Sequence, residues 1–138
     1  MISKTALHGV NALVRLVDLE PGEYMGATAL AEQISAPPNY LGKLLASLSA
    51  EGLLESRKGS GGGFRLARSA KEISIFDIVD PVDKVSRWDH CFMGLPECSE
   101  EKPCAMHLRW KLVRDEYLAM MRETSLSDLV AAEELRGG

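Results

Sequence analysis

One stretch of the chain decides its fold: residues 35–68 read SAPPNYLGKLLASLSAEGLLESRKGSGGGFRLAR. Pro37 and Pro38 predict the start of a helix, because proline costs little in a first turn whose amide protons have no helical partner. Leucines then recur at intervals of three and four residues, which predicts the core-facing stripe of that helix. The stripe consists of Leu41, Leu44, Leu45 and Leu48. We expect Gly52 to end the helix.

Two short runs follow, residues 53–57 and 64–68, and a glycine-rich segment separates them. Both read as short alternating runs of apolar and polar side chains, as in strands with one buried face. The runs and the turn between them therefore predict a β-hairpin.

The segment upstream of this stretch predicts two more helices. Apolar residues recur with helical period from Ile2 to Leu19, and Pro21-Gly22 ends that helix. A shorter helix is expected at residues 28–34, with the hydroxyl of Thr28 capping it. Ser35-Ala36 then forms a tight turn before the third helix.

The order helix, helix, tight turn, helix, hairpin predicts a mainly α-helical fold with a small β-hairpin wing. This is a winged helix-turn-helix, followed by a long dimerisation helix. We assign residues 1–80 to the winged domain, which one more short helix at residues 74–79 closes.

The outer face of the third helix predicts a DNA-reading surface. Its side chains are small or polar enough to enter a major groove and reach base edges or phosphates. Glycines in the hairpin turn let the backbone approach a duplex, and the cations beside them suit phosphate contacts. We predict DNA contacts from Thr28, Pro38, Asn39, Tyr40, Lys43, Ser47, Arg57, Lys58, Gly61 and Arg65. The alternative is a winged fold that serves as a protein-interaction module.

The net charge of −4 at pH 7 conceals an uneven distribution. Residues 1–70 carry seven Lys/Arg and six Asp/Glu, whereas residues 71–138 carry nine and fourteen. Residues 57–68 contain Arg57, Lys58, Arg65 and Arg68 without an acidic residue. Because the field at a contact surface depends on such local clusters, the overall acidity does not exclude a nucleic-acid partner.

Three cysteines and a histidine lie close together in the second half, as Cys91-x6-Cys98-x5-Cys104-x2-His107. Three loop thiols and an imidazole at the start of a helix can converge on one soft metal centre. Thiolates favour zinc or an iron–sulfur cluster over hard cations. The spacing lacks the paired Cys-x-x-Cys of zinc knuckles, so three unrelated buried thiols are the alternative.

A long helix is predicted from about Pro103 to Glu123, and it carries two apolar arcs. The first arc consists of Met106, Trp110, Val113, Tyr117, Met120 and Met121, and the second of Leu108, Leu112 and Ala119. A helix that packs on one core needs a single stripe, so two arcs indicate a second partner, another chain. We expect the first arc to form a homodimer interface; a helix sandwiched inside one domain is the alternative. Residues 81–138 thus comprise a sensor loop (89–107), a dimerisation helix (about 103–123) and a C-terminal tail.

Composition excludes several classes of protein. The chain has 138 residues, 46% hydrophobic and 26% charged, which is typical of one globular domain and not of a disordered chain. No run approaches the roughly eighteen apolar residues of a membrane span, and the start lacks the layout of a signal peptide, so we expect a cytoplasmic protein without a membrane partner. No Ser/His/Asp array, carboxylate pair or phosphate-binding loop occurs, so an enzyme is not expected.

With the hairpin and the cysteines together, the chain resembles the Rrf2 family of bacterial transcriptional regulators along nearly its whole length. The similar stretches are Tyr40–Leu45, Gly52–Leu54, Gly59–Ala67, the three cysteines and Thr124–Leu129. The resemblance implies a homodimer that binds a double-stranded, partly palindromic operator, with its long helix crossing that of its partner.

The resemblance also implies ligands for a metal centre. In cluster-binding members the three loop cysteines ligate iron, which implies that role for Cys91, Cys98 and Cys104 around a [2Fe-2S] or [4Fe-4S] cluster. The fourth ligand varies: it is a histidine at the position of His107, or an acidic residue early in the other subunit's first helix, where this chain has His8. One departure is that six residues separate Cys91 from Cys98, whereas those relatives have five. Some members of the family carry no cluster.

These observations predict a dimeric transcriptional regulator whose DNA affinity is set by a redox- or nitric-oxide-sensitive iron–sulfur cluster. One alternative is a regulator of the same fold that senses through reactive thiols or zinc. Another is a small cluster-carrying electron-transfer or adaptor protein, in which the cations of residues 57–68 would serve no purpose.

Overall fold

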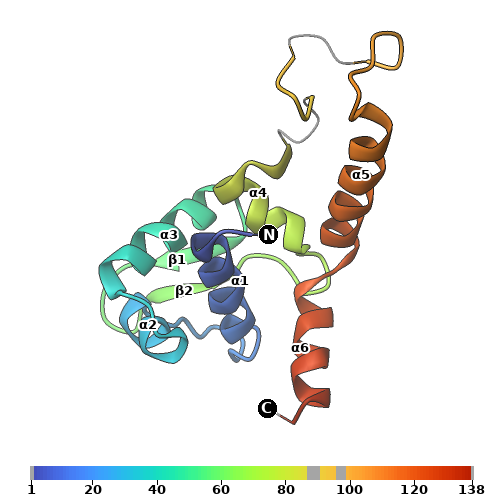
Figure 1. Ribbon diagram of the computed structural model, residues 1–138. Helices are drawn as coiled ribbons and strands as arrows, with labels where there is room; N and C mark the ends of the chain where they lie inside the picture. The colour runs from blue at the N-terminus through green and yellow to red at the C-terminus, as the bar shows by residue number, and fades with distance from the viewer. Residues whose placement is uncertain (1, 87–90, 96–98, 138) are drawn as a thin grey trace.

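The computed structural model describes residues 2–86, 91–95 and 99–137. Its helices are α1 (Lys4–Leu16), α2 (Ala27–Ile34), α3 (Pro38–Ala50), α4 (Ile75–Asp83), α5 (His107–Glu123) and α6 (Leu126–Leu135). An antiparallel hairpin, β1 (Leu54–Arg57) and β2 (Gly63–Leu66), lies between α3 and α4 in the sequence. Figure 1 shows α1–α4 and the hairpin gathered on one side, with α5 and then α6 along the other. This order confirms the predicted winged helix-turn-helix.

Helix α1 is capped at its start and tied there to α4. The Ser3 hydroxyl accepts a hydrogen bond from the Ala6 amide at 3.1 Å, which satisfies one of the first-turn donors. The Asp83 carboxylate in turn accepts hydrogen bonds from the amide and the hydroxyl of Ser3. The helix ends at Leu16, earlier than predicted, because the amides of Val17 and Leu19 bond to carbonyls three residues back and form turns instead of helix.

Helix α2 begins at Ala27 with Gly26 as its N-cap and no side-chain cap. Thr28 lies inside the first turn, so its predicted role as the capping residue is wrong. The reason is a β-bridge between Met25 and Phe64, with N···O distances of 2.9 and 2.8 Å, which holds the chain extended up to the helix start. Ser35, at φ 57°, makes the predicted tight turn into α3.

Helix α3 begins with Pro37 as N-cap and Pro38 in the first turn, as predicted. All four leucines of its stripe are buried. Helix α1 lies close on this core at Gly9, where a β-carbon would be 3.4 Å from Ile78 of α4 and 3.6 Å from Leu48 of α3. The leucine stripe therefore faces α1 and the core, and the opposite face of α3 points away from the domain.

The C-terminal part departs from the prediction at its helix ends. Helix α4 extends past residue 79 to Asp83, and Ser74 and Asp77 form a capping box at its start. Helix α5 starts at His107, not at about Pro103, because a turn precedes it in which the His107 amide donates to the Cys104 carbonyl. The predicted tail forms α6, whose start is another capping box.

One hydrophobic core joins the two halves of the chain. Leu118 and Met121 of α5 and Leu126 of α6 are buried in the same core as the leucines of α3. Met121 is only 2% exposed, which leaves almost no surface for another chain, so we remove it from the predicted dimer contacts. In the part of the chain that the structure describes, no helix combines the length and apolar character needed to cross a bilayer.

The hairpin approaches the chain before α2 most closely at Gly63. Its φ is 134°, and a β-carbon there would lie 2.3 Å from the carbonyl oxygen of Met25. We expect Gly63→Ala to break the bridge between Met25 and Phe64 and to lower the free energy of unfolding by about 3 kcal/mol. Chemical denaturation measures this loss.

Gly61→Ala is the matched control. Gly61 also has a positive φ, 75°, but its β-carbon position has no neighbouring heavy atom within 4 Å. The backbone conformation alone costs about 1–2 kcal/mol for a residue with a β-carbon. Equal losses in the two variants would contradict the close approach as the reason for glycine at residue 63.

Candidate nucleic-acid interface and thiol site

The outward face of α3 carries the side chains predicted to read DNA. Asn39, Lys43 and Ser47 are exposed, and Tyr40 is half-buried. The Ser47 hydroxyl donates to the Leu44 carbonyl at 2.7 Å, so its proton is already used within the helix. Beside these residues runs a groove of about 510 Å³ between α3 and the first turns of α1, lined by Thr5, Asn39, Tyr40, Lys43 and Leu44.

Two helix N-termini flank this surface without side-chain caps. Thr28 is exposed in the first turn of α2, and Pro38 is exposed in the first turn of α3. The amide groups of an uncapped first turn, with the positive end of the helix dipole, favour an anion such as phosphate. Thr28 thus lies where backbone amides can donate, whereas Pro38 has no N–H and the donors at the start of α3 come from the residues after it.

The tip of the hairpin carries two exposed cations, Arg57 at the end of β1 and Lys58 in the turn. Neither forms an ion pair with another described residue. Gly59 and Gly61 beside them have φ values of 90° and 75°, a conformation that favours glycine. The predicted contact residues Arg57, Lys58 and Gly61 therefore lie together on one exposed turn.

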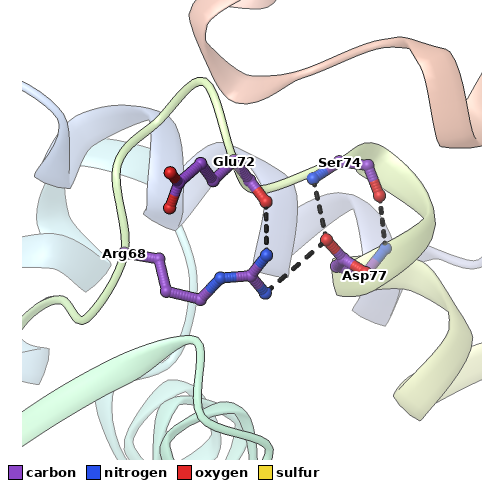
Figure 2. Close-up of polar contacts among 4 residues, drawn as sticks. All are labelled: Arg68, Glu72, Ser74 and Asp77. Atoms are coloured by element: carbon purple, nitrogen blue, oxygen red, sulfur yellow. Dashed lines mark hydrogen bonds and ion pairs between the residues drawn. The ribbon is translucent and has the colours of Figure 1, made fainter.

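Arg65 and Arg68 have structural partners, in contrast to the two cations at the tip. Arg65 pairs with Glu55 across the hairpin at 2.6 Å and lies over the ring of Tyr24, and the hydrogen bond to Glu55 raises its pKa. Figure 2 shows the guanidinium of Arg68 between the Glu72 carbonyl, at 2.5 Å, and the Asp77 carboxylate, at 3.8 Å. Acids outside residues 57–68 thus offset half of this cationic cluster.

The structure brings two of the predicted metal ligands together. The sulfur atoms of Cys91 and Cys104 are 3.6 Å apart, although 13 positions separate the residues in the sequence. Cys98, the third predicted thiol ligand, lies outside the described residues. Among the described residues, no group of three His, Cys, Asp or Glu side chains converges as a metal site.

The distance between the two sulfur atoms fits a shared metal. A disulfide bond would require about 2.05 Å, so no disulfide joins the two thiols, although the Cys91 thiol lies within hydrogen-bond distance of the Cys104 sulfur. Two thiolates on one tetrahedral metal, with bonds of about 2.3 Å, lie about 3.8 Å apart. His107 is the first residue of α5, and its Nε2 atom is shielded from solvent. The donor set of soft sulfur and imidazole suits zinc or an iron–sulfur cluster.

Two residues between Cys91 and Cys104 in the sequence contact α5. The ring of Phe92 packs against that of Trp110 at 5.4 Å. Glu100 forms an ion pair with Lys111 at 2.6 Å; this hydrogen bond lowers the pKa of Glu100 and raises that of Lys111. These two contacts join the described residues next to Cys91 and before Cys104 to the first turns of α5.

The apolar residues of α5 fall into a buried set and an exposed set, and these sets differ from the two predicted arcs. Tyr117 is partly buried against the chain's own core, together with the buried Leu118. Met106, Leu108, Leu112, Val113 and Met120 are exposed. Leu112, Val113, Glu116, Tyr117 and Met120 line a mostly apolar groove of about 670 Å³. The exposed apolar face thus combines members of both arcs.

The family model described as "Rrf2: Iron-dependent Transcriptional regulator" matches residues 2–132. The HTH-type transcriptional regulator IscR of Escherichia coli is 26% identical over 130 residues, which are 92% of this chain and 80% of that protein.

Solved structures with a similar fold include CymR of B. subtilis, named as the global cysteine regulator. It has a TM-score of 0.77 and 22% identity, and the match covers 96% of this chain and 97% of that chain. IscR of T. potens has a TM-score of 0.74 and 23% identity, over 96% of this chain and 88% of that chain. At these identities the structures establish the fold. The similar proteins are regulators and not enzymes.

Lys58 is the clearest electrostatic contact that the hairpin offers to a phosphate. We expect Lys58→Ala to weaken duplex binding to all sequences alike, and to reduce the slope of log K against log salt by about 0.9. Fluorescence anisotropy across a salt series measures both. Lys71→Ala is the control, because it also removes an exposed lysine, but one outside the hairpin. Lys71 follows Ala70, whose carbonyl accepts a hydrogen bond from Ser127 of α6. An unchanged slope in the Lys58 variant, or the same change in both variants, would contradict phosphate contact at the hairpin tip.

Proposed function

The chain belongs to the Rrf2 family of transcriptional regulators, and from that premise we propose that it is a dimer whose operator binding is controlled by an iron–sulfur cluster. Residues 1–80 would bind DNA, and residues 81–138 would provide the sensor loop and the dimer contact. This division is one of function, because both parts share one core. The observation that carries the sensing proposal is the 3.6 Å approach of the Cys91 and Cys104 sulfur atoms in a loop that contacts α5.

Three features of the winged domain support DNA contacts. The exposed face of α3 has the size and polarity for a major groove, with Asn39, Tyr40 and Lys43 as reading residues. The uncapped starts of α2 and α3 offer amides to phosphates. Arg57 and Lys58 at the hairpin tip add cations for the flanking backbone. Arg65, which is paired with Glu55, would act on DNA only through the position of the wing.

A homodimer is supported by the exposed apolar face of α5. Leu108 and Leu112 are 72% and 69% exposed. Contact of two leucine side chains of one helix with water is unfavourable in free energy, and such a patch marks an interaction site. A second copy of the chain that packs on this face through its own α5 would cover both. Two recognition helices related by such a twofold axis fit a partly palindromic operator.

The cluster proposal places Cys91, Cys98 and Cys104 as thiolate ligands. When bound, an iron–sulfur cluster supplies a redox-active centre whose state a signal can change. His107 is the better candidate for the fourth ligand, because it begins a rigid helix three residues after Cys104. His8 is less suited, since its Nδ1 lies 3.0 Å from the Tyr40 hydroxyl of its own chain.

The link from the sensor loop to DNA runs through α5. The contacts of Phe92 with Trp110 and of Glu100 with Lys111 transmit a change in the loop to the first turns of that helix. If α5 pairs with its copy, a shift of its start changes the spacing of the two recognition helices. A spacing mismatched to the operator half-sites lowers affinity.

A second candidate is a regulator that senses by direct thiol chemistry, without a cluster. The same 3.6 Å distance between Cys91 and Cys104 favours it, because a small movement would allow a disulfide. The metal content of anaerobic protein separates the two candidates.

The dimer contact is tested by Leu112→Asp, which places a charge in the exposed apolar face of α5. Burying that charge unpaired would cost several kcal/mol, so we expect the variant to sediment as a monomer at micromolar concentration and the parent as a dimer. Leu135→Asp is the control, because Leu135 on α6 is 90% exposed and lies outside this face. A monomeric parent, or a dimeric Leu112 variant, would refute the interface.

The cluster is tested by anaerobic purification. We expect coloured protein with iron and sulfide in similar amounts, and loss of colour in each of Cys91→Ala, Cys98→Ala and Cys104→Ala, because each removes a thiolate ligand. His107→Ala should weaken the cluster, whereas His8→Ala should leave it intact. Met93→Ala, at a loop residue with 61% of its surface exposed, is the control for changes in the loop itself.

Two results would argue against the cluster. Zinc without sulfide in anaerobic protein would favour the zinc alternative. Colourless protein whose DNA affinity still responds to thiol oxidants would favour direct thiol sensing.

A further inference from the structure

A histidine of α1 is bonded to the reading face of α3. The Nδ1 atom of His8 lies 3.0 Å from the hydroxyl of Tyr40. The two rings meet edge to face, with centroids 5.5 Å apart at 66°. Both side chains are half-buried, so the pair lies at the boundary between the core and the solvent-exposed face of α3.

The position of His8 is set by rigid packing on both sides of it in α1. Ala6 is fully buried, and Val10 is 6% exposed. Gly9, the next residue, lies at van der Waals distance from the core: its β-carbon position is 3.4 Å from Ile78 and 3.6 Å from Leu48. The backbone of α1 at His8 is therefore held against the core, and the hydrogen bond to Tyr40 orients the imidazole.

Tyr40 forms part of the groove between the two helices, and two exposed residues that suit DNA contact flank it. Thr5, Asn39 and Lys43 line the same groove. The hydroxyl of Tyr40 is thus held by α1 while its neighbours on α3 face outward. Within the described part of the chain, the Tyr40 hydroxyl forms a hydrogen bond with His8.

The tautomer of His8 decides what the Tyr40 hydroxyl offers to a ligand. A tyrosine hydroxyl has one proton to donate and lone pairs that accept. If the Nδ1–H of His8 donates to the Tyr40 oxygen, the Tyr40 proton remains available for an acceptor on DNA. If Nδ1 accepts instead, that proton is used inside the protein. Phosphate oxygens are acceptors only, and about half to two-thirds of protein–DNA hydrogen bonds go to the phosphates and sugars of the backbone.

We propose that His8 is a positioning residue for operator binding: its Nδ1–H holds the Tyr40 oxygen, so that the Tyr40 hydroxyl donates to an acceptor on the DNA. The orientation of Tyr40 is then fixed before DNA arrives, and no rotamer freedom is lost on binding. This inference rests on the proposed function as a DNA-binding regulator, and not on the cluster.

A double-mutant cycle on the full-length protein tests the coupling. The variants are His8→Leu, Tyr40→Phe and their combination, each measured on the duplex enriched by selection from random DNA and on a mixed-sequence duplex. Each single variant should weaken binding about fivefold, the effect of one hydrogen bond, and the combination should lose no more than either alone. An equal loss on both duplexes assigns the acceptor to a phosphate; a larger loss on the selected duplex assigns it to a base.

The conservative variant His8→Asn distinguishes positioning from a merely structural role. An asparagine amide can place a donor near the position of Nδ1, so His8→Asn should recover most of the affinity, and should lose that recovery when combined with Tyr40→Phe. The cycle of His8→Asn with Tyr40→Phe still tests the coupling if His8→Leu fails to fold. Thermal unfolding is expected to change little in the Asn variant.

Additive losses of about 25-fold in the double variant would overturn the inference, as would a His8→Asn variant as weak as His8→Leu. A parent that enriches no duplex would overturn the proposed function and this inference with it. Non-additive losses with rescue by asparagine would support His8 as the residue that orients Tyr40.

Discussion

The burial of the leucine stripe of α3 is the contact on which the rest of the structure depends. Leu41, Leu45 and Leu48 have no exposed surface, and truncating any one of them to alanine would cost about 2–5 kcal/mol. Because α3 has a single leucine stripe, the burial of that stripe determines which face of the helix points outward. Helix α1 lies against this stripe at Gly9, and that contact places His8 beside Tyr40. The presentation of the reading face is thus a consequence of core packing.

The same core holds only the C-terminal part of α5. Leu118 and Met121 anchor that end, while Leu108 and Leu112 toward the other end are exposed. In Figure 1 the start of α5 extends beyond the winged domain, and the thiol loop adjoins it there. A helix fixed at one end and joined to a sensor loop at the other can tilt without disturbing the core. In the proposed dimer, a cluster that binds or leaves at that end would change the pairing of the two α5 helices and leave each winged domain intact.

The parts of the structure that local sequence determines were predictable, and those that depend on distant residues were not. The leucine spacing, the prolines and the glycine turn specify α3 and the hairpin over a few residues each. Thr28 failed as a cap because Phe64, far along the chain, fixes Met25. Arg65 and Arg68 looked unopposed because Glu55 and Asp77 lie outside the window of residues 57–68. A helical wheel of α5 showed two apolar arcs but not that Leu118 and Met121 face the chain's own core. The Ser-x-x-Asp pattern at Ser125 was a local signal for α6 that could have been used.

The central claim is that the state of the thiol site sets the affinity for DNA. It is tested most directly by the affinity of one anaerobic preparation for its selected duplex, before and after a chelator removes the iron. We predict that the two dissociation constants differ by about tenfold or more, because in the proposed dimer a shift of α5 would change the spacing of both recognition helices at once. Equal dissociation constants, with iron loss verified in the same sample, would contradict it.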